Sequence, residues 1–273
     1  MPENYEDSLI RHRGKSETQP FPNSFEAIRK EYGVAIEADI FLLSDGTIAV
    51  VHNKDVGMSD AEVEELTADE VSELKAGGRE EGGAVPLFRE YVFNSFDRGI
   101  GVNVEIKAST PGKAEMAGRA VVDEIEKMKT EGLFTANQDY PELSLSLHSF
   151  SIEALQAARD EMSLKGLSLK LGLLWPSSPE RALDMTISAT ALEQSRERGL
   201  DSVPWPERAI EIAAQEGIGV VDIHASNINE EIVEKAHSQH LKVYAWVVTN
   251  AEQARHLLEM GVDKIIYEPH ATS

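Results

Sequence analysis

Short apolar runs alternate with longer segments of helical spacing along the whole 273-residue chain. Each run has five to nine residues, which is the size of a buried strand, and most are rich in Val, Ile and Leu. The run at 47–52 follows the turn signal Ser-Asp-Gly-Thr at 44–47, so we interpret it as an excursion from the regular alternation and do not count it among the barrel strands. Eight runs are then left as strands of one sheet: 8–12, 34–42, 101–107, 143–149, 169–175, 219–224, 241–248 and 262–267.

The segments between these runs begin with signals that are typical of helix starts. Asn23 followed by Glu26 indicates a capping box, Thr110 precedes a first-turn proline, and Asn250 with Gln253 opens a further helix. Eight strands alternating with helices predict an α/β fold with a closed parallel sheet, the (β/α)₈ TIM barrel. An open doubly wound sheet shares this alternation, but no G-x-G-x-x-G follows the first strand.

Residues 54–85 interrupt the alternation. They are acidic, show only weak helical spacing, and end in two glycine pairs at 77–78 and 82–83. We therefore predict a small insertion after the second strand, on the upper rim of the barrel. Because no linker or repeat divides the chain, residues 1–273 are expected to form a single barrel domain that carries this insertion.

Composition excludes several classes of function. The chain has no cysteine, which rules out disulfides, thiolate nucleophiles and sulfur-ligated metals. Its formal charge of −22 disfavours nucleic acid and anionic membrane surfaces as partners. No run approaches the ~20 apolar residues of a membrane span, and the start lacks the pattern of a secretory signal. We expect a cytoplasmic protein without stable membrane insertion.

Two carboxylates stand out in the apolar run at 34–42. Glu37 and Asp39 are two residues apart, so both side chains point to the same face of the strand. The run at 101–107 repeats this spacing with Glu105 and Lys107. Because buried like charges need a positive partner, three carboxylates meeting at one rim predict a site for Mg²⁺, Ca²⁺ or Mn²⁺. From spacing alone, an exposed strand or an ion pair with Lys or Arg remains the alternative.

Four of the eight histidines end apolar runs: His12, His52, His148 and His224. In a barrel of this type the carboxyl ends of the strands form the rim where the chemistry takes place, so this group is a candidate for acid–base roles. Arg13 and Lys107 would add positive charge at the same rim, suited to an anion. A histidine at a strand end can equally be structural.

Seven motifs follow one another in a fixed order and span nearly the whole chain: HRG (12–14), IEADIFLLSDGTIAVVHN (36–53), VPLFREYV (85–92), VNVEIK (102–107), HSF (148–150), VYAWVVTN (243–250) and GVDKIIYEP (261–269). Their combination resembles the glycerophosphodiester phosphodiesterases, a family of (β/α)₈ barrels related to phosphatidylinositol-specific phospholipase C. The resemblance implies metal-dependent hydrolysis of a small-molecule phosphodiester to an alcohol and glycerol 3-phosphate.

The resemblance also implies a cofactor, one divalent cation that is Mg²⁺ or Ca²⁺, with Mn²⁺ as a third option. It assigns roles to eight residues: Glu37, Asp39 and Glu105 bind the metal, His12 and His52 act as general acid and base, Arg13 and Lys107 neutralise the phosphate, and Trp246 lines the substrate pocket. A core or rim position is the alternative for the tryptophan.

The chain departs from the family pattern at three places. The common Glu-Asn-Thr before the first helix is Pro-Asn-Ser at 22–24, His-Asp after the second strand is His-Asn at 52–53, and the final Thr-Asp-x-Pro is Tyr-Glu-Pro at 267–269. These changes suggest a divergent member whose substrate need not be the usual one.

Other functions fit the same fold. A lysophospholipase D or sphingomyelinase D type of activity would use the same barrel, and a non-catalytic barrel that binds phosphodiesters is an alternative from another class. A sugar isomerase with a carboxylate and histidine metal site matches in fold alone, which says little about function.

Overall fold

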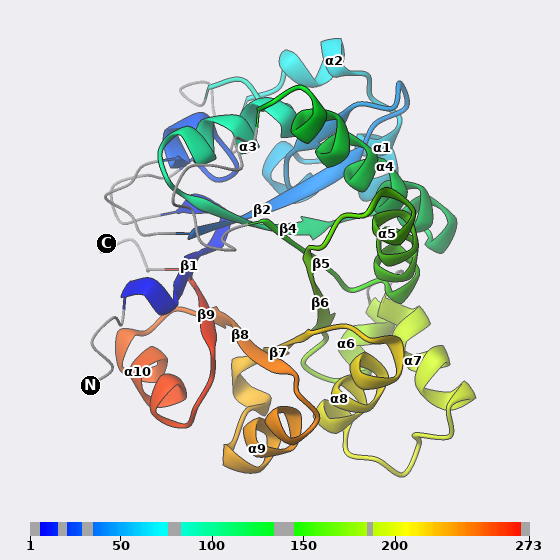
Figure 1. Ribbon diagram of the computed structural model, residues 1–273, viewed down its shortest axis with the longest axis vertical. Helices are drawn as coiled ribbons and strands as arrows, with labels where there is room; N and C mark the ends of the chain where they lie inside the picture. Colours follow the sequence, from blue (N-terminus) through cyan, green and yellow to red (C-terminus); the bar gives the residue numbers. More distant parts are fainter. Residues whose placement is uncertain are drawn as a thin grey trace.

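The computed structural model describes residues 6–15, 21–28, 35–75, 83–133, 145–184 and 188–268 (Figure 1). Its strands form one sheet in the order β1-β9-β8-β7-β6-β5-β4-β2-β3, and pairing of β1 with β2 closes the sheet into a barrel. Eight strands pair in parallel and β3 is antiparallel to β2, which confirms the predicted (β/α)₈ barrel. The strands are β1 (Leu9–Arg11), β2 (Ala35–Leu42), β3 (Ile48–Val50), β4 (Gly101–Ile106), β5 (Leu145–Ser149), β6 (Lys170–Trp175), β7 (Val220–His224), β8 (Lys242–Val248) and β9 (Lys264–Tyr267).

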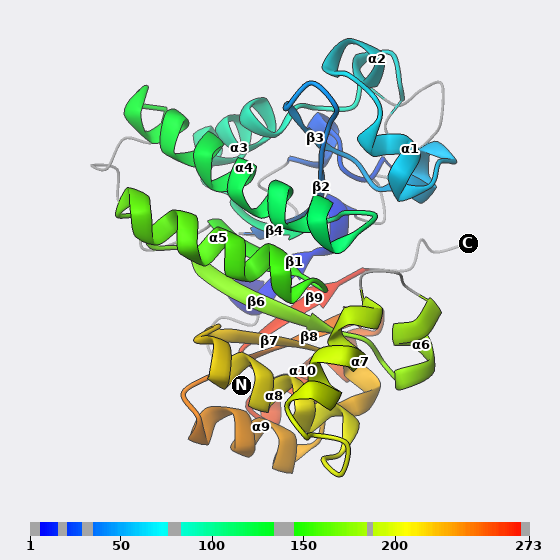
Figure 2. The same cartoon turned by 90° about the vertical axis from the view of Figure 1, so that its right-hand side faces the viewer.

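Helices surround this barrel on its outside, and α4 and α5 run side by side along one wall (Figures 1 and 2). The helices around the barrel are α3 (Phe88–Asp97), α4 (Pro111–Thr130), α5 (Ile152–Lys165), α6 (Pro179–Asp184), α7 (Ser188–Glu197), α8 (Trp205–Glu216), α9 (Glu230–Ser238) and α10 (Ala251–Glu259). Short 3₁₀ turns lie at η1 (Glu6–Ser8), η2 (His12–Gly14), η3 (Phe25–Ala27), η5 (Asn53–Val56) and η7 (Ala225–Asn227). None of the described helices is long and apolar enough to cross a membrane.

Two of the three predicted helix starts are confirmed. The Thr110 side chain accepts a hydrogen bond from the backbone of Lys113, and Asn250 caps α10 in the same way. At the first predicted helix the cap is Ser24, whose hydroxyl accepts a hydrogen bond from the Ala27 amide at 3.2 Å, and not Asn23. Asn23 has a positive φ of 52°, a conformation that asparagine tolerates, and its amide is used elsewhere.

The barrel has two apolar regions of different size. A large core fills the space between the sheet and its helices. Inside the barrel, where alternate residues of each strand point, a small separate cluster joins Ile10, Val220, Tyr244 and Ile266. The other inward positions near it are mostly polar, so the interior offers a setting for charged side chains that the outer core does not.

The insertion after the second strand has its own apolar cluster. Helices α1 (Asp60–Glu64) and α2 (Ala68–Ser72) place Val63 and Val71 against Phe41 and Ala49 of the β2–β3 hairpin. In the described part of the segment predicted as an insertion, an isolated bridge pairs Lys75 with Ala84. Residues 76–82, which include Gly77, Gly78 and Gly82 of the two glycine pairs, lie outside the described residues. A second excursion, which the sequence did not predict, places α6 and α7 between β6 and α8 (Figure 2).

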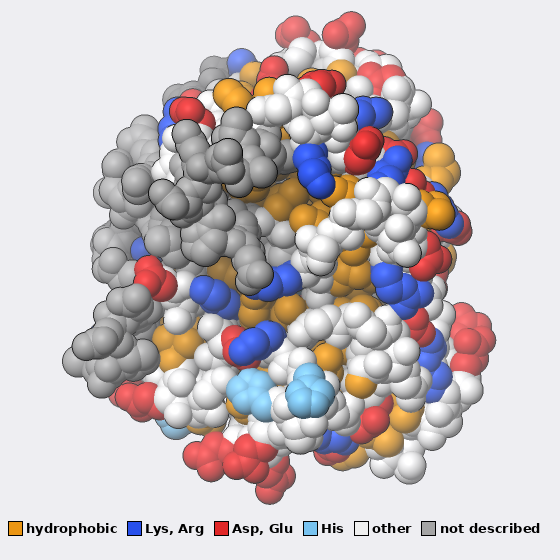
Figure 3. Space-filling model, in the orientation of Figure 1, with side chains coloured by type: hydrophobic (Ala, Val, Ile, Leu, Met, Phe, Trp, Pro, Cys, Tyr) orange, Lys and Arg blue, Asp and Glu red, His pale blue; other side chains and the backbone are white. Residues whose placement is uncertain are grey.

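The charge of the surface is not uniform. On the face seen in Figure 3, Asp and Glu side chains lie mainly toward the edge, whereas several Lys and Arg side chains lie nearer the middle. The large negative charge of the chain is therefore compatible with local groups of cations.

Candidate active site

Three carboxylates converge on one point at the mouth of the barrel. Glu37 and Asp39 lie in β2, and the parallel register places Asp39 beside Glu105 of β4. One oxygen of each lies within 4.8 Å of the others. Glu37 and Asp39 are buried and Glu105 is half-buried, so the convergence that the strand spacing predicted is present in the structure.

The three carboxyl groups titrate differently because their surroundings differ. Burial raises the pKa of Glu37 well above its ordinary value, and the neighbouring Asp39 and Glu105 carboxylates raise it further. Burial also raises the pKa of Glu105. Although burial alone would raise it, the pKa of Asp39 lies far below its ordinary value because Lys107 and Arg13 stabilise the anion.

Two cations contact this acidic cluster. Lys107 Nζ lies 2.5 Å from Glu105 Oε1 and 3.2 Å from Asp39 Oδ1. Arg13 pairs through Nε with Asp39 Oδ2 at 3.0 Å, and through Nη1 with Asp55 Oδ2 at 3.2 Å. The sequence left open an ion pair with Lys or Arg as the alternative to a metal site. The structure contains such pairs, because Asp39 and Glu105 contact Lys107 and Asp39 contacts Arg13.

The donor atoms suit a hard divalent cation. Within the described chain, Glu37 Oε1 is buried and has no hydrogen-bond partner. The cluster with Asp55 brings four carboxyl groups to two cations, which leaves a surplus of negative charge. An all-oxygen set with one unpartnered buried oxygen is the chemistry that Mg²⁺, Ca²⁺ or Mn²⁺ prefers.

The HRG turn at the end of β1 has an unusual backbone. Arg13 has a φ of 53° and Gly14 a φ of 68°, both in the left-handed region. A Cβ on Gly14 would lie 2.5 Å from the Ala27 side chain, so glycine is required there. The Arg13 amide donates a hydrogen bond to Glu37 Oε2 at 2.9 Å, which helps to hold a conformation that is costly for arginine.

His12 is held between two carboxylates. Its Nδ1 is hydrogen-bonded to Glu268 Oε2, and its Nε2 lies 3.9 Å from Glu37 Oε2. Burial lowers the pKa of His12, while the hydrogen bond from His12 lowers the pKa of Glu268 to about 2. These directions describe a neutral imidazole that donates from Nδ1 to an ionised Glu268, leaving the Nε2 lone pair available. Lys15 also donates to Glu268, at 2.8 Å.

In His52 the two ring nitrogens have roles opposite to those in His12. It is 8% exposed, it follows β3, and its Nδ1 accepts a hydrogen bond from the Lys54 amide at 3.2 Å. Burial lowers the pKa of His52 to about 3, so the ring is neutral near pH 7. With Nδ1 acting as an acceptor, the proton of the neutral ring is on Nε2.

Asn23, which the sequence suggested as a helix cap, contacts the acidic cluster. Its Nδ2 donates to Asp39 Oδ2 at 2.9 Å, and its Oδ1 accepts from the Asp39 amide at 3.2 Å. Sequence reasoning also missed the contacts of Glu268 and Asp55. The available signal for Glu268 was its position directly after the last strand, at the same rim as His12.

Trp246 belongs to an aromatic wall at the rim. Its ring is edge-on to Phe150 at 5.4 Å and to His224 at 5.2 Å between centroids, and Nε1 donates to the Asp222 carbonyl at 3.0 Å. Lys107 Nζ lies 6.0 Å from the centre of the Phe150 ring, so the wall adjoins the cations.

His148, the fourth histidine of the run-end group, does not face this site. It is buried inside the barrel, where its Nδ1 is 2.6 Å from Asp222 Oδ2 and its Nε2 is 2.8 Å from Asn103 Nδ2. The structural alternative therefore applies to this residue.

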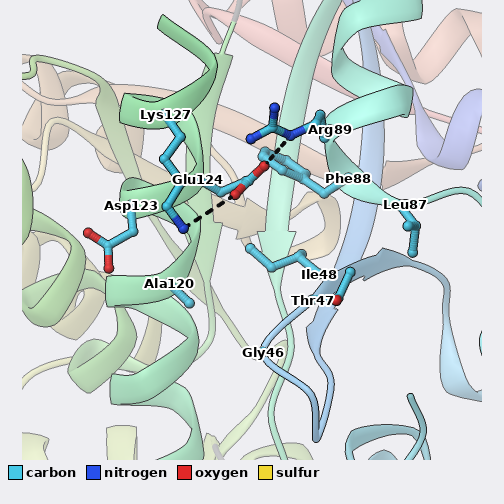
Figure 4. Close-up of a pocket in the computed structure, with 10 residues that line it drawn as sticks. All are labelled: Gly46, Thr47, Ile48, Leu87, Phe88, Arg89, Ala120, Asp123, Glu124 and Lys127. Carbon is cyan, nitrogen blue, oxygen red and sulfur yellow. Dashed lines mark hydrogen bonds and ion pairs between the residues drawn. The ribbon is translucent and has the colours of Figure 1, made fainter. Parts of the chain in front are cut away.

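A hollow of about 410 Å³ lies away from the acidic cluster, between the β2–β3 turn, α3 and α4 (Figure 4). Three of its charged side chains pair with one another, since Glu124 contacts Arg89 at 2.6 Å and Lys127 at 3.9 Å, and the fourth, Asp123, pairs with Lys165 at 2.8 Å. None of the candidate catalytic or metal-binding residues lines it.

The fold and site define an α/β-barrel protein with an oxygen-donor cluster, two basic side chains and two histidines at one mouth of the barrel. A model of the glycerophosphoryl diester phosphodiesterase family matches residues 12–270. The chain therefore belongs to this family of enzymes.

Relatives and solved structures agree with this assignment. The chain is 24% identical to a glycerophosphodiester phosphodiesterase of Caldanaerobacter subterraneus, over 97% of this chain and 95% of that protein. A phosphodiesterase of Oleispira antarctica, solved in complex with the product sn-glycerol-3-phosphate, has a similar fold with a TM-score of 0.68, 19% identity, and coverage of 95% and 92% of the two chains. A glycerophosphodiester phosphodiesterase of Parabacteroides distasonis gives a TM-score of 0.67 at 18% identity, with the same coverage.

Proposed function

We propose that this chain hydrolyses glycerophosphodiesters to an alcohol and glycerol 3-phosphate at the mouth of its barrel. The observation that carries the proposal is the convergence of three carboxylates with two cations, beside His12 and His52. The product named for the similar O. antarctica structure supports this choice of substrate class. The partner we propose is accordingly a small-molecule phosphodiester.

Glu37, Asp39 and Glu105 would hold one divalent cation, for which we propose Mg²⁺ or Ca²⁺, with Mn²⁺ as a third option. Such an ion supplies positive charge that offsets the negative charge of the phosphodiester and of its transition state. Arg13 and Lys107 add fixed positive charge at the same place and orient the phosphate.

Each of the two histidines takes part in one proton transfer. His12 accepts a proton at Nε2 from the attacking hydroxyl, which belongs to water or to the substrate glycerol. Glu268 keeps the ring in the tautomer that this step needs and stabilises the imidazolium that forms. His52 acts in its imidazolium form, which the anionic substrate favours: it gives its Nε2 proton to the departing alcohol and returns to the neutral ring, which in the resting protein accepts from the Lys54 amide at Nδ1. Trp246 lines the substrate side of the site.

The test is a panel of glycerophosphodiesters with different alcohols, together with lysophosphatidylcholine and sphingomyelin, each assayed with Mg²⁺, Ca²⁺ or Mn²⁺. On the best substrate, His12→Ala and His52→Ala should each lower kcat by roughly 10²-fold or more. His256→Ala is the matched control, because this histidine is exposed on α10. Full activity in either of the first two variants removes that residue from the mechanism, and lipid cleavage without glycerophosphodiester cleavage contradicts the proposed substrate class.

A further inference from the structure

Two of the three guanidinium nitrogens of Arg13 contact acidic side chains. Nε pairs with Asp39 and Nη1 donates to Asp55, while Nη2 donates no hydrogen bond to any described residue. Because the guanidinium is planar and rigid, fixing Nε and Nη1 also fixes the direction of the remaining Nη2 hydrogens. Asp39 is a candidate metal ligand, whereas Asp55 contacts Arg13 and is not one of the three carboxylates of the candidate metal site.

Asp55 comes from the first turn of the insertion, directly after a proposed catalytic histidine. This turn, η5, begins at His52, whose Nδ1 accepts from the Lys54 amide, and it ends at Gly57 with a φ of 70°. The Asp55 amide donates to the His52 carbonyl at 2.9 Å. The Asp55 side chain is 21% exposed, and its backbone bond to His52 and its ion pair with Arg13 link the two residues.

The insertion that carries this turn is fastened to the barrel at points remote from Arg13. Glu64 of α1, which is 3% exposed, accepts hydrogen bonds from the Ser109 amide at 2.7 Å and from the Ser109 hydroxyl. On the other side, the Ala68 amide donates to Asp45 Oδ2 at 2.8 Å. These contacts brace the insertion against the loop after β4 and the β2–β3 turn, so that Asp55 is supported by a fixed element.

Electrostatics alone would disfavour an acid at this position. A fourth carboxylate beside Glu37, Asp39 and Glu105 adds negative charge that repels an approaching phosphate. By charge alone, Asp55 would weaken the binding of an anion. It nevertheless contacts Arg13, the cation that would bind the anion. We explain this contact by the effect of Asp55 on the orientation of the Arg13 side chain.

We propose that Asp55 is a positioning residue, which holds the Arg13 guanidinium so that its Nη2 edge faces an oxygen of the bound phosphate. The insertion thereby completes the anion site rather than only covering the rim. This inference rests on the proposed function in that the anion is the phosphoryl group of the substrate.

The direction of the effect on anion binding distinguishes positioning from simple repulsion. Titration calorimetry of the protein in Mg²⁺ with inorganic phosphate and with sn-glycerol 3-phosphate measures affinity without turnover. If Asp55 positions Arg13, Asp55→Asn weakens binding by roughly 5- to 10-fold, the loss expected for one misdirected charge-assisted hydrogen bond. If Asp55 only repels anions, Asp55→Asn tightens binding. Asp69→Asn, an exposed acid on the same insertion, is the matched control and should leave affinity unchanged.

A double-mutant cycle tests whether the effect passes through Arg13. In an Arg13→Lys background, which lacks the planar fork, Asp55→Asn should change affinity by less than 2-fold. Asp55→Glu, which keeps the charge, should recover part of the wild-type affinity, and the melting temperatures of the variants check that each is folded. Unchanged or tighter binding in Asp55→Asn, or an equal loss in both backgrounds, overturns the proposal.

The outcomes also separate this inference from the proposed function. A wild-type protein that binds phosphate but cleaves no glycerophosphodiester contradicts the proposed function, while the calorimetry still decides the role of Asp55. A wild-type protein that binds neither anion overturns the assignment of Asp55 directly.

Discussion

Replacing Gly172 by alanine should disrupt the polar interior of the barrel. Gly172 lies in β6, beside the buried hydrogen bonds that His148 makes with Asp222 and Asn103. A Cβ at this position would lie 2.0 Å from His148 Nδ1 and 2.5 Å from Asp222 Oδ2. His148 is 1% exposed and Asp222 0%, so neither side chain can move aside into solvent.

The expected loss of stability follows from the bonds that the methyl group displaces. The His148–Asp222 bond involves a charged carboxylate and is worth about 1.5–3 kcal/mol, and the Asn103–His148 bond about 0.5–1.5 kcal/mol. Overpacking a buried site adds about 1–3 kcal/mol. Gly172→Ala should therefore lower the free energy of unfolding by about 3–7 kcal/mol, a large part of the roughly 5–15 kcal/mol typical of a folded protein.

Urea unfolding followed by circular dichroism measures this loss. Gly112→Ala is the control, because a Cβ at Gly112 meets no atom within 4 Å and the residue lies near the start of α4. Alanine there should be neutral or stabilise by up to about 1 kcal/mol, since it is the better helix former. A Gly172→Ala protein within 1 kcal/mol of wild type would show that the interior network rearranges at little cost, and would refute the reasoning.

Three further perturbations test other parts of the structure. The pKa of Glu268 is lowered from 4.5 to about 2, so its stabilising effect is complete above pH 4.5 and is lost as pH falls toward 2. The difference in unfolding free energy between wild type and Glu268→Gln should shrink over that range, and a constant difference from pH 6 to pH 3 contradicts this. Added Mg²⁺, Ca²⁺ or Mn²⁺ should raise the melting temperature of the wild-type protein but not that of Glu37→Gln. Removal of the metal by a chelator should abolish activity. Equal shifts of the melting temperature in both proteins argue against the metal site. A Cβ on Gly118 would lie 2.2 Å from the Ala154 carbonyl oxygen, so Gly118→Ala should separate α4 from α5 and cost about 1–3 kcal/mol, against no loss in Gly112→Ala.

The barrel was predictable because its strands are parallel and buried on both faces. Such strands appear in the sequence as nearly continuous apolar runs, and each of the eight predicted runs contains an observed strand. The excursion with α6 and α7 was missed because each barrel strand was expected to be followed by one helix, and α8 alone meets that expectation between β6 and β7. Asn23 was misread as a cap because asparagine favours both cap positions and the left-handed conformation that it adopts here.

The acids of the site were also predictable, but their supporting contacts were not. Glu37 and Asp39 are conspicuous because a carboxylate is out of place in an apolar strand. The contact between His12 and Glu268 joins residues 256 positions apart, across the seam where the first and last strands meet. No local pattern reports such a contact, since it exists only once the barrel closes. Asp55 was hidden for a related reason, because its partner Arg13 lies on another strand end.

The unfavourable features of this protein are concentrated in the same small region as its candidate catalytic groups. Arg13 adopts a left-handed conformation that costs of the order of 1–3 kcal/mol, and an oxygen of Glu37 is buried without a hydrogen bond at a comparable cost. A sequence selected for stability alone would have apolar residues at these positions. Such residues do fill the barrel interior nearby, where Ile10 and Ile266 lie on neighbouring strands. The presence of the unfavourable groups together at the carboxyl ends of the strands is therefore better explained by what they bind than by how they fold.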